Sequence, residues 1–161
     1  MAVPRMVEGE ASRLIAWSQE LRRVHDRLRH ALRLTREAFN EGDDVHGASR
    51  ELLLYCHGFC AALDEHHRSE DHTLFPAIEA ANPQLRPVLR TLRQDHSMIA
   101  HLLTGLREAT ERASSPDELA RHVEGLAAIM ENHFRYEERA LLEVLEALEL
   151  DATVDDALGS I

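Results

Sequence analysis

The 161-residue chain contains no lysine, and it has only two cysteines and seven aromatic residues. All 18 residues of its Lys/Arg class are therefore arginines, and against 29 acidic residues they leave a net charge of −11. This acidic balance argues against a nucleic-acid or anionic-membrane partner, because both select basic surfaces. Cys56 and Cys60 are too few for a disulfide framework and favour a reduced, cytoplasmic compartment.

Long apolar runs are also missing. The run Leu52–Cys56 is far shorter than the roughly 20 residues needed to cross a bilayer. Residues 1–10 mix proline, arginine and glutamate without an apolar stretch, so we expect no signal peptide. Hydrophobic residues make up 44% of the chain, which fits one folded domain over residues 1–161. The residue in excess is histidine, with 11 copies.

Apolar residues recur at helical spacing along almost the whole chain, and no segment alternates as a strand would. We expect four helices of about 30 residues joined by short loops, which is typical of an all-α, up-down-up-down four-helix bundle. The bundle core covers about residues 12–148. The expected helices run from about Ser12 to Glu41, from after Ser49 to between Phe75 and Ala81, from Asn82 or Pro83 to about Ala113, and from Ser115 to about Leu148.

The ends of these segments carry recognisable signals. Ser115 as N-cap, Pro116 at the first helical position and Glu118 as the partner of a capping box mark the start of the fourth helix. Pro76 predicts a kink or a restart near the end of the second. The tail, residues 149–161, is acidic and weakly patterned, so we expect it to be frayed.

The chain also repeats itself internally. The first helix overlays the third at a shift of 71 residues, and the second overlays the fourth at a shift of 67. This pattern indicates a helical hairpin used twice, with a pseudo-twofold axis between the two halves. The polar pairs that match are His25 with His96, His66 with His133, and Glu70 with Glu137.

Six polar residues lie within the apolar stripes that must face the bundle core. Counted from the helix ends at about 1.5 Å per residue, all six fall in one layer to within roughly one turn. A buried carboxylate without a partner is strongly unfavourable, so two of them demand positive charge nearby. The six residues are His25, His66, Glu70, His96, His133 and Glu137.

Four imidazoles and two carboxylates form a ligand set for two metal ions bridged by carboxylates. Imidazole and carboxylate without thiolate favour iron or manganese over structural zinc or calcium. If Glu70 and Glu137 both bridge and solvent supplies a further bridge, each ion is about five-coordinate, which leaves room for O2, peroxide or nitric oxide. The alternative, a satisfied core histidine, suits any one position better than six groups in one layer.

Other histidines fall outside this layer. His30 and His101 match across the repeat but lie off the apolar stripe, so we expect them to be exposed. His67 and His72 flank the stripe of the second helix, and we expect surface positions for both over a role in supporting the ligands. His122 lies about three turns, or 16 Å, from the candidate ligand on its own helix, too far to join the site.

The segments that carry these residues resemble the hemerythrin family, more narrowly its HHE cation-binding branch, over about residues 14–148. The strongest segment is His66–Pro76, which is similar to the family's His-x-x-x-Glu-Glu-x-x-Leu-Phe-Pro run. The others are His133–Leu142, Val24–Leu28 and Asp95–Ile99. The resemblance implies two non-haem iron ions with a solvent-derived oxo or hydroxo bridge. It places His25 and His66 on one iron and His96 and His133 on the other, with Glu70 and Glu137 as bridges.

The chain departs from the oxygen-carrying hemerythrins, which use five histidines. Ala100 stands where those proteins place a second histidine on the third helix, and Glu137 lies four residues after His133 where they place an aspartate five residues on. The six-ligand pattern resembles the branch that contains iron–sulfur repair proteins and bacterial hemerythrin-like proteins with peroxide-related activity. The cysteine-bearing N-terminal region of the repair proteins is absent.

Three functions follow as hypotheses. The first is a di-iron protein that binds O2, nitric oxide or peroxide, with a peroxide-consuming or nitric oxide-directed oxidoreductase activity or a role in oxidative or nitrosative stress. The second is a non-enzymatic iron or oxygen sensor, or iron-handling module, that acts through a partner. The third is a bundle with a silent structural metal. Ferritin-like chemistry needs Glu-x-x-His, which does not occur in the chain. We expect a monomer or a weak homo-oligomer.

Overall fold

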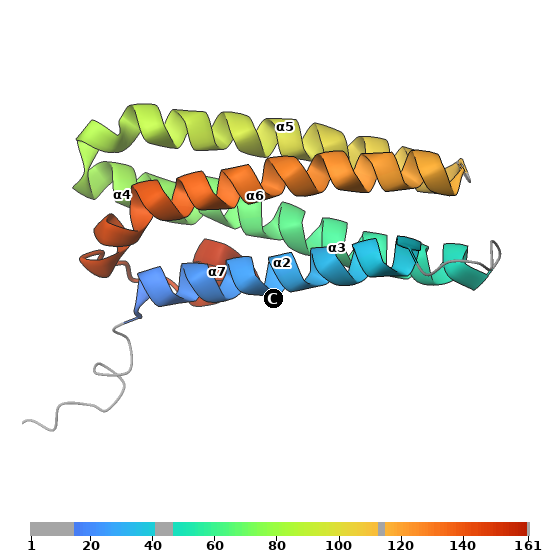
Figure 1. Ribbon diagram of the computed structural model, residues 1–161. Helices are drawn as coiled ribbons and strands as arrows, with labels where there is room; N and C mark the ends of the chain where they lie inside the picture. Colours follow the sequence, from blue (N-terminus) through green and yellow to red (C-terminus); the bar gives the residue numbers. More distant parts are fainter. Residues whose placement is uncertain (1–14, 41–46, 113–114, 161) are drawn as a thin grey trace, which may run out of the picture.

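The computed structural model describes residues 15–40, 47–112 and 115–160, and the side chains of residues 15–37, 58–112 and 115–160. Four long helices run through these ranges, and no strand occurs in them (Figure 1). The expected helix boundaries Ser12 and Glu41 and the side chain of Cys56 lie outside the described residues. The long helices are α2 (Trp17–Asn40), α3 (Gly47–Ser69), α5 (Arg86–Glu111) and α6 (Pro116–Glu146).

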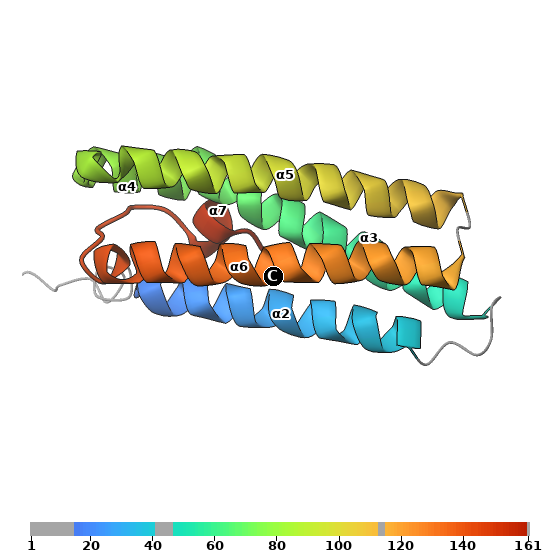
Figure 2. The same ribbon diagram turned by 45° about the horizontal axis from the view of Figure 1, so that its top comes forward.

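The long helices form a closed ring of neighbours. Helix α2 packs against α6 and α3, and α5 packs against the same two helices. Figures 1 and 2 show the helices side by side along one axis, each running opposite to the helix that precedes it in the chain. The expected all-α, up-down-up-down four-helix bundle is confirmed.

The second long segment changes its helical geometry near its end. After α3 the chain makes a π-helical turn, η1 (Glu70–Leu74), and then continues as α4 (Phe75–Ala81). The N–H of Phe75 donates to the carbonyl of Glu70, five residues back, and Pro76 follows in the first turn of α4. Pro76 has no N–H to donate, so it is tolerated at a helix start but not within a helix. The irregularity therefore falls one turn before the proline, in the turn that carries Glu70.

The other helix ends follow the sequence signals closely. A short 3-10 turn, η2 (Pro83–Leu85), leads into α5. At the start of α6, the Ser115 hydroxyl accepts a hydrogen bond from the N–H of Glu118 at 3.2 Å, and Pro116 is the first helical residue. Helix α2 begins at Trp17, and residues 15 and 16 before it are not helical.

The expectation of a frayed tail is wrong for the described part of residues 149–161. The chain folds back and forms a short helix, α7 (Val154–Leu158), capped by the Thr153 hydroxyl. Ala157 and Leu158 are fully buried, and α7 packs against α3 and η1. The two buried apolar residues of α7 do not form a pattern long enough to predict a helix from the sequence. The stability of such a short helix comes from tertiary packing rather than from helix propensity.

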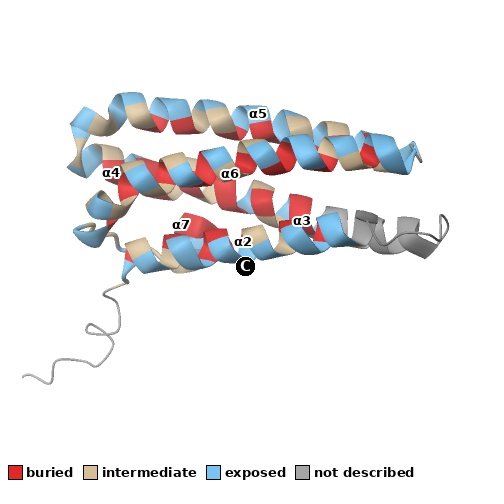
Figure 3. Cartoon of the chain, in the orientation of Figure 1, coloured by how far each residue is buried: buried red, intermediate tan, exposed pale blue. Residues whose placement is uncertain are grey.

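The core is a continuous apolar interior interrupted by one polar layer. Figure 3 shows the buried positions as stripes along the inward sides of the helices. Trp17, Phe75 and Phe134 are the largest buried side chains, and leucines from the four long helices fill most of the remaining space. Cys60 is a free, buried thiol. No described helix is long and apolar enough to cross a membrane.

Candidate metal centre

The structure brings the six expected polar residues together at mid-bundle. None of their side chains is more than 4% exposed. They come from all four long segments of the bundle, and the antiparallel packing of these segments places the six side chains at the same level along the bundle axis. The residues are His25 on α2, His66 on α3, Glu70 on η1, His96 on α5, and His133 and Glu137 on α6.

Glu70 lies between imidazoles from two helices. Its Oε1 lies 3.0 Å from the Nε2 of His66 and 3.5 Å from the Nε2 of His96. A carboxylate placed between two such nitrogens has the arrangement that a bridging ligand requires.

Glu137 lies between the other two imidazoles and turns one carboxylate oxygen toward each. Its Oε1 is 3.5 Å from the Nε2 of His25, and its Oε2 is 3.1 Å from the Nε2 of His133. The two glutamates thus hold corresponding positions in the two halves of the bundle.

The donor atoms separate into two groups. Within each group, one nitrogen or oxygen of every residue lies within 4.8 Å of the others. One group contains His25, His66, Glu70 and Glu137, and the other contains His67, His96 and His133. His25 thus lies with His66, and His96 with His133, in the pairs that the sequence suggested.

In each of the four expected histidines, the Nδ1 atom donates a hydrogen bond away from the centre. Carboxylates and carbonyls only accept, so a neutral ring must carry its proton on Nδ1 and turn the lone pair of Nε2 inward. Such outer partners orient metal-binding histidines. The bonds run from His25 to Glu138 at 3.1 Å, from His96 to Asp71 at 2.8 Å, from His133 to Asp95 at 3.1 Å, and from His66 to the Leu158 carbonyl at 2.7 Å.

These four acceptors are not among the site residues predicted from the sequence. Glu138 and Asp71 each follow the inward glutamate of their helix, at matching positions of the repeat, and this adjacency was a readable signal. Asp95 directly precedes His96 but supports His133, which is a relation between helices that no pattern within one helix encodes. The carbonyl of Leu158 carries no side-chain signal at all.

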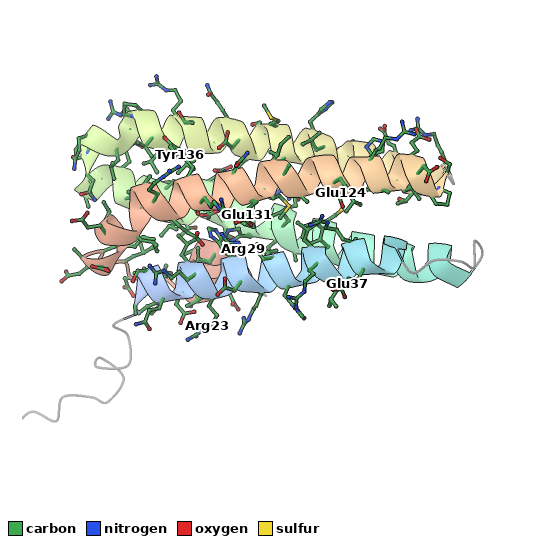
Figure 4. All side chains as sticks on the ribbon, in the orientation of Figure 1. Arg23, Arg29, Glu37, Glu124, Glu131 and Tyr136 are labelled. Atoms are coloured by element: carbon green, nitrogen blue, oxygen red, sulfur yellow. The ribbon has the colours of Figure 1, made fainter. Side chains whose placement is uncertain are left out.

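Arg29 fixes Glu138 in place. Its guanidinium makes two hydrogen bonds to the Glu138 carboxylate, at 3.0 and 3.1 Å, and a third to Glu131 at 3.1 Å. Figure 4 shows Arg29 and Glu131 facing each other across the contact between α2 and α6. Burial alone would raise the pKa of Glu138, but the bonds with His25 and Arg29 outweigh it and hold the pKa at about 2. Glu138 is therefore a fixed anion.

The two inward carboxylates have opposite electrostatic environments. Burial, together with the charge of Glu137, raises the pKa of Glu70 well above its ordinary value. Burial would also raise the pKa of Glu137, but Glu70 and His133 outweigh that effect and keep it well below its usual range. Two buried carboxylates as close as Glu70 and Glu137 need a compensating positive charge nearby or a proton held between them.

The two neighbouring histidines of α3 are neutral near pH 7. Burial lowers the pKa of His66 to about 3, and the adjacent His25 acts in the same direction. Burial and the ring of His96 lower the pKa of His67 well below its ordinary value. Neutral imidazole is the form that binds a metal ion.

Unsatisfied polar atoms gather at this one place. Among the described residues, every buried side-chain nitrogen or oxygen that has no hydrogen-bond partner belongs to this layer. Leaving such atoms unpaired costs roughly 1–3 kcal/mol each. Their convergence fits a bound cation, which would satisfy all of them at once. The atoms are the Nε2 of His25, His66 and His67 and both carboxylate oxygens of Glu70 and Glu137.

The remaining histidines divide into confirmed and wrong expectations. His30, His72 and His101 are exposed, as expected. His67 is only 5% exposed, so its expected surface position is wrong. It sits about 100° round the helix from His66, and its ring stacks against His96 on α5, with the ring centroids 3.9 Å apart.

Comparison with known protein families supports this description. Residues 18–154 match the Hemerythrin HHE cation binding domain, which covers most of the chain and all six expected residues. Searches among curated proteins and among solved structures found no match. The geometry and the family match lead to the same assignment: the chain belongs to the hemerythrin HHE cation-binding domain family.

Proposed function

We propose that the chain holds two iron ions in the polar layer. His25 and His66 would bind one ion, His96 and His133 the other, and Glu70 and Glu137 would be shared by both. The observation that carries the proposal is the convergence of buried, unpartnered donor atoms in this layer. Imidazole nitrogen with carboxylate oxygen, and no thiolate among these residues, suits iron or manganese.

The close approach of two imidazoles supports the proposal independently. The Nε2 atoms of His96 and His133 lie 3.1 Å apart. Both rings donate from Nδ1 to an aspartate, so both present Nε2 to each other. Two lone pairs at this distance repel unless a proton or a cation lies between them.

The function that the site supports best is reversible or reactive binding of a small ligand such as O2, nitric oxide or peroxide. When bound, the iron pair supplies redox chemistry and a coordination position for the ligand. The chain's own residues orient the nitrogens through their Nδ1 partners and surround the layer with apolar side chains that exclude bulk water. This favours a role in oxygen, peroxide or nitrosative stress, and the scarcity of cysteine favours a reduced cytoplasmic setting.

A sensor or iron-handling module is the second candidate, and the position of α7 favours it. The Leu158 carbonyl accepts a hydrogen bond from His66. Leu158 belongs to the short helix α7, which packs against α3 and η1. A change at His66 would therefore reach the tail, where a partner could respond. The distinguishing result is a conformational or oligomeric change on iron loading without turnover of peroxide or nitric oxide.

The first experiment is metal analysis of anaerobically prepared protein, followed by titration with O2, peroxide and nitric oxide. The expected result is about two irons per chain, with a near-ultraviolet charge-transfer absorption. His66→Ala and Glu137→Ala should each abolish the absorption and most of the iron, and His72→Ala, at an exposed position close in sequence, should keep both. Full iron in the first two variants, or equal uptake of zinc with no response to oxidants, would contradict the proposal.

A further inference from the structure

The imidazole of His66 takes its hydrogen-bond acceptor from outside the repeated hairpins. In the second half of the bundle, Asp95 on α5 accepts the Nδ1 proton of the corresponding histidine, His133. At the shift of 71 residues that overlays α2 on α5, the position of Asp95 is held by Val24, a core residue that is 2% exposed. The first hairpin therefore lacks the carboxylate that the second one uses. The Leu158 carbonyl of α7 takes its place, at 2.7 Å.

Helix α7 also lies against most of one donor group. It contacts α2, α3 and η1 (Figure 1). These elements carry His25, His66 and Glu70, which are three of the four residues whose donor atoms cluster together in the first half of the centre. Ala157 and Leu158 are fully buried against the bundle, whereas the two residues before them are exposed. Helix α7 thus stands between this donor group and the solvent.

Few interactions hold α7 in this position. A helix of five residues is not stable without tertiary contacts. Beyond its two buried side chains and the bond to His66, it is fastened at the surface, where the hydroxyl and the N–H of Ser160 donate to the Glu65 carboxylate at 2.9 and 3.3 Å. Segments with few buried apolar contacts and exposed hydrogen bonds open locally more often than core helices do.

The donor group that α7 covers is closed to solvent. The side chains of His25, His66, Glu70 and Glu137 are all 0% exposed. An ion reaches four fully buried residues only when a neighbouring part of the chain moves aside. Separating two long helices would expose core side chains over many turns, whereas undocking α7 exposes its two buried side chains. Undocking of α7 is therefore the less costly opening.

We propose that α7 is a lid for the ion position formed by His25, His66, Glu70 and Glu137. A divalent transition metal ion enters and leaves this position while α7 is undocked. When α7 docks again, the Leu158 carbonyl sets the ring of His66. The proposal rests on the proposed function, since it requires that the polar layer binds metal. Coupling between two sites is reciprocal, so an ion bound beside His66 also holds α7 in place.

Two variants loosen the lid without removing a donor atom. Glu65→Ala removes the acceptor of both Ser160 hydrogen bonds at the surface. Leu158→Ala keeps the main-chain carbonyl and removes the buried side chain. Glu124→Ala is the matched control, because this exposed glutamate of α6 pairs with Arg36 on α2, at 2.8 Å. Far-ultraviolet circular dichroism of the metal-free proteins checks that all three variants are folded.

The rates of metal exchange are the decisive measurement. Co2+ serves as the probe, because its visible absorption reports binding to nitrogen and oxygen ligands. Stopped-flow mixing of metal-free protein with Co2+ gives the uptake rate, and mixing of loaded protein with excess EDTA gives the release rate. We expect Glu65→Ala to speed both uptake and release of one of the two ions by about two- to tenfold, as the loss of one or two hydrogen bonds allows. Leu158→Ala should have a larger effect, and Glu124→Ala should match the wild type.

Hydrogen exchange followed by mass spectrometry reports on the lid directly. In the metal-free wild type, the amides of residues 154–160 should exchange faster than those in the middle of α6. They should exchange more slowly once Co2+ is bound, and faster in both lid variants. Amides of α7 as protected as those of α6 in all the metal-free proteins would overturn the inference, because α7 would then be a fixed part of the core.

The two rates separate a lid from a segment that only positions His66. Faster release with an unchanged uptake rate in both lid variants would overturn the inference, since it would mean weaker binding without easier access. Unchanged rates despite faster hydrogen exchange in α7 would also overturn it and would place the route of the ion elsewhere. Each of these results leaves the metal centre itself intact. A wild-type protein that binds neither Fe2+ nor Co2+ would instead overturn the proposed function, and this inference with it.

Discussion

At the scale of single residues, the centre depends on groups behind the histidines as much as on the histidines. Each of the four expected histidines has one acceptor for its Nδ1 proton, and three of these acceptors are carboxylates. A carboxylate behind an imidazole fixes the orientation of the ring and makes its inward nitrogen a stronger donor. We therefore expect the outer residues Asp71, Asp95 and Glu138 to affect metal affinity without touching the ion.

Removing one such carboxylate should weaken metal binding while leaving the fold intact. We expect Asp71→Ala to lower iron affinity by about 10- to 100-fold, because His96 loses the partner that sets its tautomer. Chelator competition measures the change. Asp64→Ala is the control, since Asp64 forms an ion pair with the exposed Arg68, at 3.2 Å, and is not one of the residues bonded to the inward histidines. Equal affinities in the two variants would contradict this role for Asp71.

Among the buried histidines, His66 should make the metal-free protein less stable in acid. Burial lowers the pKa of His66 to about 3 in the folded chain, against about 6.5 in an unfolded chain. Between these values the unfolded state binds a proton that the folded state does not. The free energy of unfolding therefore falls as the pH falls from about 6.5 toward 3, by up to about 1.4 kcal/mol per pH unit from this group.

Urea unfolding of the metal-free protein at stepped pH values tests this prediction. His25 and His96 act in the opposite direction, because their carboxylate partners outweigh burial and raise their pKa values. The informative quantity is therefore the difference between wild type and His66→Leu. We expect the variant to lose less stability than the wild type on acidification below pH 6.5, and identical pH dependences would refute the prediction.

At the scale of secondary-structure elements, the short helix α7 is attached to the bundle at one close backbone contact. Gly159 has a φ of +88°, and a Cβ built there would lie 3.1 Å from the backbone N of His66. Both the left-handed conformation and the lack of space favour glycine. The turn brings the Leu158 carbonyl onto the imidazole of His66.

Gly159→Ala should consequently loosen α7. We expect a loss of about 1–3 kcal/mol in unfolding free energy from the strained backbone and the clash, with weaker iron binding beside His66. Thermal unfolding and chelator competition measure the two effects. Gly125→Ala is the matched control: it lies in α6 with nothing within 4 Å of an added Cβ, so alanine should leave stability equal or higher. A neutral Gly159→Ala would contradict the role given to this turn.

The long elements were predictable from sequence and the short ones were not. The four helices and the inward positions of His25, His66, His96 and His133 follow from a strong 3.6-residue periodicity. The π-turn at Glu70–Leu74 adds one residue to a helical turn. The types of residue in that turn do not reveal the extra residue, and the nearby Pro76 is its one sequence signal. Helix α7 has too few apolar residues to register.

The misplacement of His67 has a different cause. A residue 100° from the centre of a stripe sits at the edge of the buried face, and single-helix geometry does not tell which neighbour covers it. The covering residue is His96, on a helix that begins 19 positions later in the chain, at Arg86. Positions at the edge of a stripe are therefore where helix-by-helix prediction of the site fails.

At the scale of the whole molecule, the two hairpins are alike in plan and different in detail. The pair His25–Glu138 corresponds to His96–Asp71, because both partners follow the inward glutamate of the opposite hairpin. His133 and His66 differ: the first is supported by Asp95, and the second by a main-chain carbonyl from the tail. The repeat builds a symmetric ring of helices, and single substitutions then give its two halves different chemical surroundings.

The bond between His66 and Leu158 joins residues separated by 92 positions in the chain. During synthesis on a ribosome, the bundle helices emerge first, and this imidazole has no carbonyl to orient it until Leu158 has also left the exit tunnel. The orientation of the His66 ring therefore depends on a residue that is synthesised 92 positions later. A nascent chain would collapse around its apolar stripes with that half of the centre still unfinished.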